Sequence, residues 1–405
     1  MGLKPWMTSD DLVESVKRKI AVPLNQRTFS AVDILSFANE EMLIAQVPDI
    51  MIYHQEYFVY SEDLTLVVGQ LRYPIPERAM GQKLRDIFYK DTNGNLFEMT
   101  RISPDDKSYW ERESGTTNLM QKYYLEGNDV VLAPLTLSQV TGSLHVSYFL
   151  RPNMLVPNDR AAIVQSFFTN VTLDNTTLVA GGTVNVGGLI FTAVSGSPSA
   201  LQFQIGSTSA ISAANLTTAI NLDGTYSSTN SASSVTDIIY LSNGLVISSL
   251  SPGFSISSKF GMQFTDVLPT HFTPGMLVDV LQTRPGHKLL SKDVQLGINS
   301  LSTNSILFDS IPLTFEIGDY IAEQYECIIP QIPPDLHNGL AERTAARLLA
   351  AQGDAQGLQI SQAKIAEIKH SEGVLLENRV DGSTEKVNQR KSCLSFQRMG
   401  IRRRI

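Results

Sequence analysis

The stretch IIPQIPPDLHNGLAERTAARLLAAQGDAQGLQISQAKIAEIKHSEGVLLENRV, from Ile328 to Val380, is the most strongly helical part of the sequence. The Pro-Pro-Asp run at 333–335 supplies a turn and a helix cap directly ahead of an apolar period. Apolar and small residues then recur at helical spacing, and the resulting stripe comprises Leu336, Leu340, Ala341, Thr344, Ala345, Leu348 and Leu349. The same period predicts that Glu342, Arg343 and Arg347 lie on the opposite face.

Gly353 and Gly357 interrupt this period, and a second helix is predicted after them. One side of the second helix carries Leu358, Ile365, Ile368 and Leu375. Two such helices are not stable alone in water, because helix formation needs tertiary packing of the apolar face. We therefore expect a partner for them elsewhere in the chain.

The beginning of the chain supplies that partner. Thr8 or Ser9 caps a helix over 10–22, which ends at Pro23, and Ser30 opens a second helix over 31–47, which Pro48 closes. The second helix has an apolar face formed by Ile34, Phe37, Ala38, Met42 and Ala45. We expect the helical hairpin of residues 1–55 and the helices of residues 331–380 to form one helical domain.

Between the two helical regions the hydrophobic period changes from helical spacing to two. Alternating or β-branched segments run over 57–76, 84–99, 122–134 and 142–152, with hairpin-turn signals at Asn93-Gly94 and at Gly127-Asn128-Asp129. A further set of strands is predicted over 277–310 and 315–330. The fold class is therefore α+β, with an antiparallel sandwich or barrel, in one or two parts, formed by residues 56–160 and 266–330.

Residues 161–258 contain no Lys or Arg and are rich in Ser, Thr, Gly and Asn. Their apolar alternation predicts strands at Val184–Val194, Leu201–Ile205 and Ile238–Leu241, with one short helix over 211–222. A flexible linker would lack this alternation. We interpret residues 165–265 as an all-β module inserted into the β region.

The chain has 405 residues, a net charge of −8 and two cysteines, Cys327 and Cys393, which are too far apart for a CxxC motif. No basic-then-apolar leader and no apolar run of membrane-spanning length is present, so we expect a soluble protein without a membrane partner. The six histidines are scattered, and no phosphate-binding or nucleophile motif occurs. We expect no enzyme activity, no cofactor and no metal; a nuclease centre around Asp105 and Asp106 is an alternative.

The last 25 residues, 381–405, form a basic segment. From Glu385 onward there are seven basic residues and one acid, and apolar side chains are interleaved among them. A solvated tail does not need apolar anchors, so we expect this segment to dock on a partner. The predicted docking residues are Arg390, Lys391, Phe396, Arg398, Met399, Ile401, Arg402, Arg403, Arg404 and Ile405.

These features together resemble the head-to-tail connector proteins of tailed bacteriophages, with the greatest similarity to the neck ring proteins of crAss-like phages. The tracts MTSDDLVESVKRKIAVPLNQRTFSAVDILSFANEEM and KLRDIFYKDTNGNLFEMTRISPDD carry most of this resemblance, together with the helix that follows Pro334. The tract GGLIFTAVSGSPSALQFQIGSTSAISAANLTTAI is similar to β-modules of phage tail and collar proteins.

The resemblance implies a structural virion protein of the neck, made in the host cytoplasm. It implies a ring of twelve copies below the portal protein, with helices packed around a DNA channel and C-terminal tails inserted into the portal. The portal and a downstream tail or neck ring protein are the implied partners, and genomic double-stranded DNA in the channel is a further candidate. A tail or collar protein whose uncharged module binds host glycans is another hypothesis.

Overall fold

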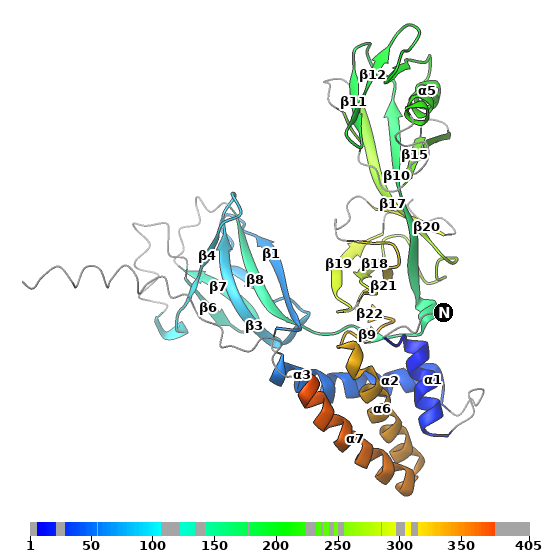
Figure 1. The fold of residues 1–405 in the computed structure, drawn as a ribbon. Coiled ribbons are helices and arrows are strands. Elements are labelled where there is room, and N and C mark those ends of the chain that lie inside the picture. The colour runs from blue at the N-terminus through cyan, green and yellow to red at the C-terminus, as the bar shows by residue number, and fades with distance from the viewer. Residues whose placement is uncertain are drawn as a thin grey trace, which may run out of the picture.

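The structure is a computed structural model. It describes residues 6–21, 29–54, 56–106, 122–133, 142–176, 178–223, 232–235, 238–242, 247–249, 255–284, 286–296, 304–308 and 315–376. Figure 1 shows three parts: helices from both chain ends packed together, a β sandwich at one side of them, and a long β arm that rises from them. The predicted α+β fold class is confirmed.

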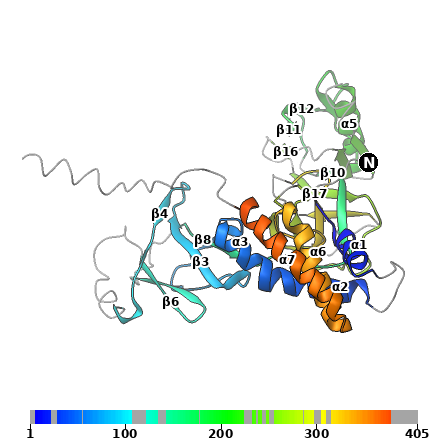
Figure 2. The ribbon, with the colours of Figure 1, turned by 60° about the horizontal axis from the view of Figure 1, so that its bottom comes forward.

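The helical body combines the first and last elements of the described chain. Its helices are α1 (Ser9–Lys19), α2 (Ala31–Glu41), the π-helical turn η1 (Met42–Gln46), α3 (Val47–Tyr53), the 3-10 turn η4 (Pro334–Leu336), α6 (His337–Gln352) and α7 (Ala355–Leu375). Thr8 and Ser30 cap α1 and α2, each in a reciprocal capping box with an aspartate three residues later. Figure 2 shows α6 and α7 lying over α2 and α3. Within the described ranges, no helix combines the length and the apolar composition needed to cross a bilayer.

Two predicted helix boundaries were wrong. Pro48 does not close the second helix: it occupies the first turn of α3, directly after the π-helical turn, where the missing N–H of proline is tolerated. Gly357 does not interrupt the last helix, because its backbone N–H donates to the Asp354 side chain, which caps α7. Gly353 does end α6, in the left-handed conformation with φ of 76°.

The first sandwich consists of two four-stranded sheets with the strand orders β1-β8-β3-β4 and β2-β7-β6-β5. Its strands are β1 (Val59–Thr65), β2 (Arg72–Pro74), β3 (Ala79–Lys90), β4 (Leu96–Glu98), β5 (Thr100–Arg101), β6 (Lys122–Glu126), β7 (Asp129–Ala133) and β8 (Ser143–Leu150). Both sheets contribute to one buried cluster that includes Tyr73, Val130, Val146 and Tyr148. The predicted turns at Gly94 and Gly127 are confirmed, and both glycines have positive φ.

The β arm is organised around two long paired strands, β10 (Ala161–Asp174) and β17 (Ser255–Phe264). The start of β10 pairs with β21 (Tyr320–Glu323) and its far end with β15 (Ile238–Ser242). The lower half of the arm also contains β9 (Met154–Leu155), the 3-10 turn η3 (Asn158–Arg160), β18 (Leu277–Leu281), β19 (Leu289–Gln295), β20 (Ser305–Phe308) and β22 (Glu326–Cys327). One buried cluster, including Val164, Met262, Phe264 and Ile321, fills this half.

The far half of the arm is the uncharged module. It contains β11 (Thr183–Val186), β12 (Leu189–Val194), β13 (Gln202–Gln204), α5 (Ser209–Leu222), β14 (Ala232–Val235) and β16 (Ile247–Ser249), and it has a buried cluster of its own. The predicted helix over 211–222 is confirmed by α5. The single strand predicted at Val184–Val194 is instead a hairpin, because Gly187 and Gly188 both have positive φ and reverse the chain.

Candidate functional site

The core of the helical body brings together residues from opposite ends of the chain. Ile34, Met42, Leu336, Leu340 and Leu348 are all buried within one cluster, and half-buried Phe37 packs against it. The small side chains of Ala341 and Ala345 lie in the same cluster and allow α6 to approach α1 and α2 closely. Figure 1 shows the blue and orange helices in direct contact.

The face of α6 that carries charges is covered as well. Glu342 and Arg343 are buried, because α1 and α7 pack over that face. The Glu342 carboxylate accepts hydrogen bonds from Lys19 Nζ at 2.6 Å and from Ser361 Oγ at 3.2 Å. Of the three charged residues predicted on this face, Arg347 alone has a half-exposed side chain, and it pairs with Glu41 of α2.

A second ion cluster attaches α7 to the body. Arg343 Nη2 lies 3.1 Å from the Asp49 carboxylate and 3.4 Å from the Glu372 carboxylate. Burial raises the pKa of Glu372, and the neighbouring Arg343 opposes that shift. Leu358, Ile365 and Ile368 are half-buried on the side of α7 that also buries Ser361 and Glu372, whereas Leu375 is exposed.

A buried polar joint connects the sandwich to the arm. Arg78, directly before β3, makes a two-pronged pair with Asp279 of β18, with N–O distances of 2.7 and 2.8 Å. Asp293 of β19 pairs with the same guanidinium at 2.7 Å, and the Asn153 side chain donates to Asp279 at 2.8 Å. Because Arg78 and Asp279 are both buried, each stabilises a charge that would otherwise lack solvation. The joint therefore fixes the angle between the two β parts.

Two buried histidines lie where the beginning of the chain meets α6. The His337 ring accepts a hydrogen bond from the Met7 backbone N–H at 3.0 Å, and the His287 ring lies between His337 and Trp6, with centroid distances of 5.6 and 6.0 Å. Burial lowers the pKa of His337 to about 4. Burial, followed by the neighbouring His337, lowers the pKa of His287 to about 4 as well. Both rings are therefore neutral near pH 7 and serve as packing groups.

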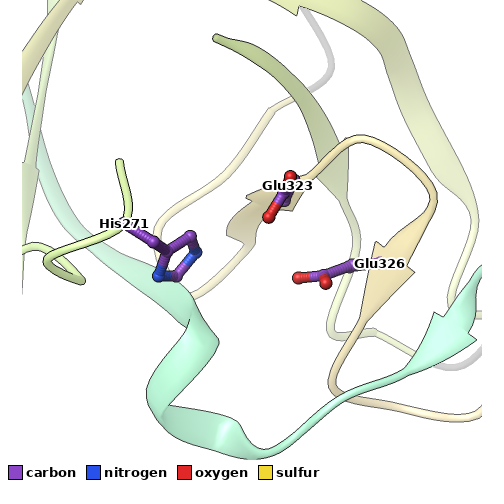
Figure 3. A group of neighbouring side chains, drawn as sticks. All are labelled: His271, Glu323 and Glu326. Atoms are coloured by element: carbon purple, nitrogen blue, oxygen red, sulfur yellow. The ribbon is translucent and has the colours of Figure 1, made fainter. Parts of the chain in front are cut away.

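One group of side chains has the composition of a metal site. His271 projects toward the carboxylates of Glu323 and Glu326, as Figure 3 shows, and the three ligand atoms lie within 4.8 Å of one another. However, the Arg160 guanidinium already pairs with Glu323 at 2.7 Å and with Glu326 at 2.9 and 3.0 Å. A bound cation would have to displace this guanidinium and repel its charge. The group is therefore best described as an ion cluster that holds η3 against β21 and β22.

Of the two predicted nuclease carboxylates, only that of Asp105 lies within the described residues. Asp105 is exposed in the one-turn 3-10 helix Pro104–Asp106, and its backbone N–H donates to Ser103. The Asp106 side chain and Lys107 lie outside the described residues. In the described part of the chain, the group at His271 is the one that could hold a metal by composition and distance, and it does not include Asp105.

The basic segment lies outside the described residues, which end at Leu376. Its predicted docking residues, from Arg390 to Ile405, therefore remain predictions.

The sequence did not reveal the interhelical ion pairs of Lys19, Asp49 and Glu372, because charged residues in an amphipathic pattern ordinarily mark the solvated face.

Residues 7–175 match the family model of the SU10 adaptor protein. The match covers less than half of the chain: it includes α1 to α3, the first sandwich and β10, and it stops directly after β10. No curated protein matches the sequence. The similarity over residues 7–175 supports an adaptor, structural role in a phage particle, with other structural proteins of that particle as partners.

Proposed function

We propose that this protein is a head-to-tail adaptor that joins the portal to a downstream tail or neck component around the DNA channel. In this proposal it forms a homo-oligomeric ring, the dodecamer that the resemblance implies. The match of residues 7–175 to the SU10 adaptor model is the observation that carries this proposal. The matched segment contains only part of the core of the helical body, and α6, the residues just before it and strands β18, β19 and β21 supply most of the rest. A domain closed by both chain ends is suited to a scaffold that must bear load between two other components.

The outer surface of the helical body is the proposed contact between copies. Tyr53 of α3 lies beside Gly373 of α7, and the residues next to this contact, Ile52, Val374 and Leu375, are 71, 61 and 59% exposed. Exposed apolar side chains that adjoin one another favour protein association. In this proposal the first sandwich and the β arm decorate the ring, and residues 381–405 dock on a neighbouring component.

The oligomeric state tests the proposal. Native mass spectrometry and electron microscopy of the pure protein are expected to show a closed ring. The double variant Ile52→Glu/Leu375→Glu is expected to stop ring formation without lowering the melting temperature, because both side chains are already exposed. A matched control is Val179→Glu, which likewise replaces an exposed apolar side chain by a carboxylate. Val179 belongs to the module and is 59% exposed.

A protein that stays monomeric in the presence and absence of the purified portal protein would contradict the adaptor proposal. Rings that survive the double variant would contradict the proposed contact surface and leave the adaptor role standing. DNA cleavage that depends on Mg²⁺ and is lost in Asp106→Ala would instead support the nuclease alternative.

A further inference from the structure

A surface cavity of about 510 Å³ lies at the base of the β arm, where α1 begins. It is lined by the first turn of α1, by η3, by the start of β10 and by the turn after β17. Its size falls in the range of ordinary ligand pockets. The cavity is not part of the ion clusters that hold the helical body together.

The walls of the cavity are fixed by hydrogen bonds. Asn158 donates to Thr8 Oγ1 at 3.2 Å and accepts from Ser9 Oγ at 2.8 Å, which connects η3 to the start of α1. The Ser9 backbone N–H donates to the Ile328 carbonyl at 2.7 Å, and this bond connects the same turn to the segment after β22. The cavity is therefore preorganised, and an occupant does not have to order it.

The lining is acidic. Asp11, Asp159 and Asp266 line the cavity, and no Lys or Arg is among the lining residues. Within the described residues, Asp266 forms no salt bridge or side-chain hydrogen bond, and Asp159 interacts with Arg160 only at longer range. The Asp11 carboxylate accepts from the Thr8 backbone N–H and from Thr8 Oγ1 within the capping box. Three carboxylates in a lining that contains no Lys or Arg favour a cationic occupant, although Arg160 lies at longer range from Asp159.

The lining is also partly apolar. Val267 and Ile163 face solvent with 69 and 42% of their surface exposed. An inorganic cation would leave both side chains in water, whereas a peptide with alternating basic and apolar residues would cover them. The segment RMGIRRRI at 398–405 has this composition, and Arg is the side chain best suited to pair with carboxylates.

We propose that this cavity is the receptor for residues 398–405 of a second copy of the chain. The proposal rests on the ring assembly proposed above, and it names the partner of the basic segment. Figures 1 and 2 both show α7 ending beside α3, at the opposite end of the helical body from α1. The described part of the chain therefore ends away from the first turn of α1, which lines the cavity.

Disulfide trapping in the full-length protein tests the contact. Cys393→Ser removes the cysteine outside the described residues, and Cys327 is buried. In that background, Val267→Cys with Ile405→Cys is expected to give a ladder of covalent oligomers under mild oxidation. The matched control, Val179→Cys with Ile405→Cys, places the cysteine at an exposed module residue and is expected to give no ladder. Cross-links within single chains, or equal ladders from both pairs, would overturn the proposal.

A charge exchange shows whether the carboxylates select the occupant. Asp159→Arg/Asp266→Arg is expected to abolish the ladder, and adding Arg402→Glu/Arg403→Glu is expected to restore it. A general loss of folding would not be rescued by the second pair. Failure of the exchange to restore the ladder, with the melting temperature unchanged, would contradict the proposed pairing.

A binding measurement separates this proposal from ring formation. A fluorescent peptide of residues 390–405 is added to full-length protein that carries Arg402→Glu/Arg403→Glu, so that the protein's own segment does not compete. Saturable binding that weakens about tenfold in Asp159→Asn/Asp266→Asn is expected, even if the protein is monomeric. Absence of binding would overturn the receptor proposal. A monomeric protein that binds the peptide would contradict ring formation and leave the receptor proposal standing.

Discussion

Lys19 of α1 and Glu342 of α6 are separated by 323 positions in the sequence, and their side chains form a salt bridge with Nζ and Oε2 2.6 Å apart. The Glu342 side chain is 5% exposed, and the Lys19 side chain is 21% exposed. The two ends of the chain are thus joined by a pair that is mostly removed from water.

Removing one member of this pair tests its contribution. Glu342→Ala removes the carboxylate that accepts from Lys19 and Ser361, and we expect a loss of about 1–3 kcal/mol in the free energy of unfolding, measured in urea. The control is Glu14→Ala, which removes an exposed pair with Arg18 and is expected to cost no more than about 0.5 kcal/mol. Equal losses in the two variants would contradict the importance of the interhelical pair.

Gly339 of α6 lies beside the Glu372 side chain of α7. A Cβ at this position would lie 2.1 Å from Glu372 Oε1, so Gly339→Ala is expected to destabilise the protein although alanine favours helices. Gly373→Ala is the matched control, because its Cβ would meet Tyr53 Oη at an ordinary 3.4 Å. We expect the control to be neutral or to stabilise by up to about 1 kcal/mol. Thermal melting of both variants measures the difference, and partial rescue of Gly339→Ala by Glu372→Ala is expected.

We expect the two buried histidines, His287 and His337, to make the helical body less stable at acidic pH. Their pKa is lowered from 6.5 in the unfolded chain to about 4 in the fold, so protons bind the unfolded state more tightly. The free energy of unfolding therefore keeps its full value above pH 6.5. It decreases as the pH falls toward 4, by an amount on the order of a few kcal/mol. His287→Phe is expected to reduce this pH dependence, because it removes one of the two buried rings whose pKa is lowered. His370→Phe, at an exposed position of α7, should leave it unchanged.

Arg160 is expected to determine whether the cluster at His271 binds metal. In Arg160→Met the carboxylates of Glu323 and Glu326 lose their partner, and we expect Zn²⁺ binding to be measurable by titration calorimetry. The unmodified protein and the variant Arg160→Met/His271→Ala should bind no Zn²⁺ at this cluster. Tight binding by the unmodified protein that is lost in His271→Ala would show that the guanidinium does not block the cluster.

The uncharged module is expected to be removable if the cut respects the strands. Thr169 of β10 and Phe260 of β17 are register partners, so replacing residues 170–259 by Asn-Gly should close a hairpin and retain the lower cluster. Native mass spectrometry should show the same oligomer as for the full chain. Cutting at 165–264 instead removes buried Met262 and Phe264 and should unfold the arm. Loss of the oligomer after the first cut alone would place the module in the assembly interface.

The sequence by itself determined the elements that depend on local chemistry. The apolar period around Leu340 and Leu348 predicted α6, the Thr8 and Ser30 caps predicted the starts of α1 and α2, and Asn93-Gly94 predicted a hairpin. Each of these signals acts within a few residues, through side-chain periodicity, capping hydrogen bonds or positive φ. The α+β class followed from the same signals.

Only the tertiary structure decided which faces were buried and which charges were paired. Glu342 and Arg343 look like solvated residues in the sequence, but α1 and α7 cover them, and their partners are supplied by distant segments. Pro48 stays within a helix because the π-helical turn before it alters the local hydrogen bonding. The Arg160 pairs at Glu323 and Glu326 and the joint of Arg78 with Asp279 likewise join residues more than 150 positions apart. Such pairs depend on the packing of whole elements, which short-range patterns do not specify.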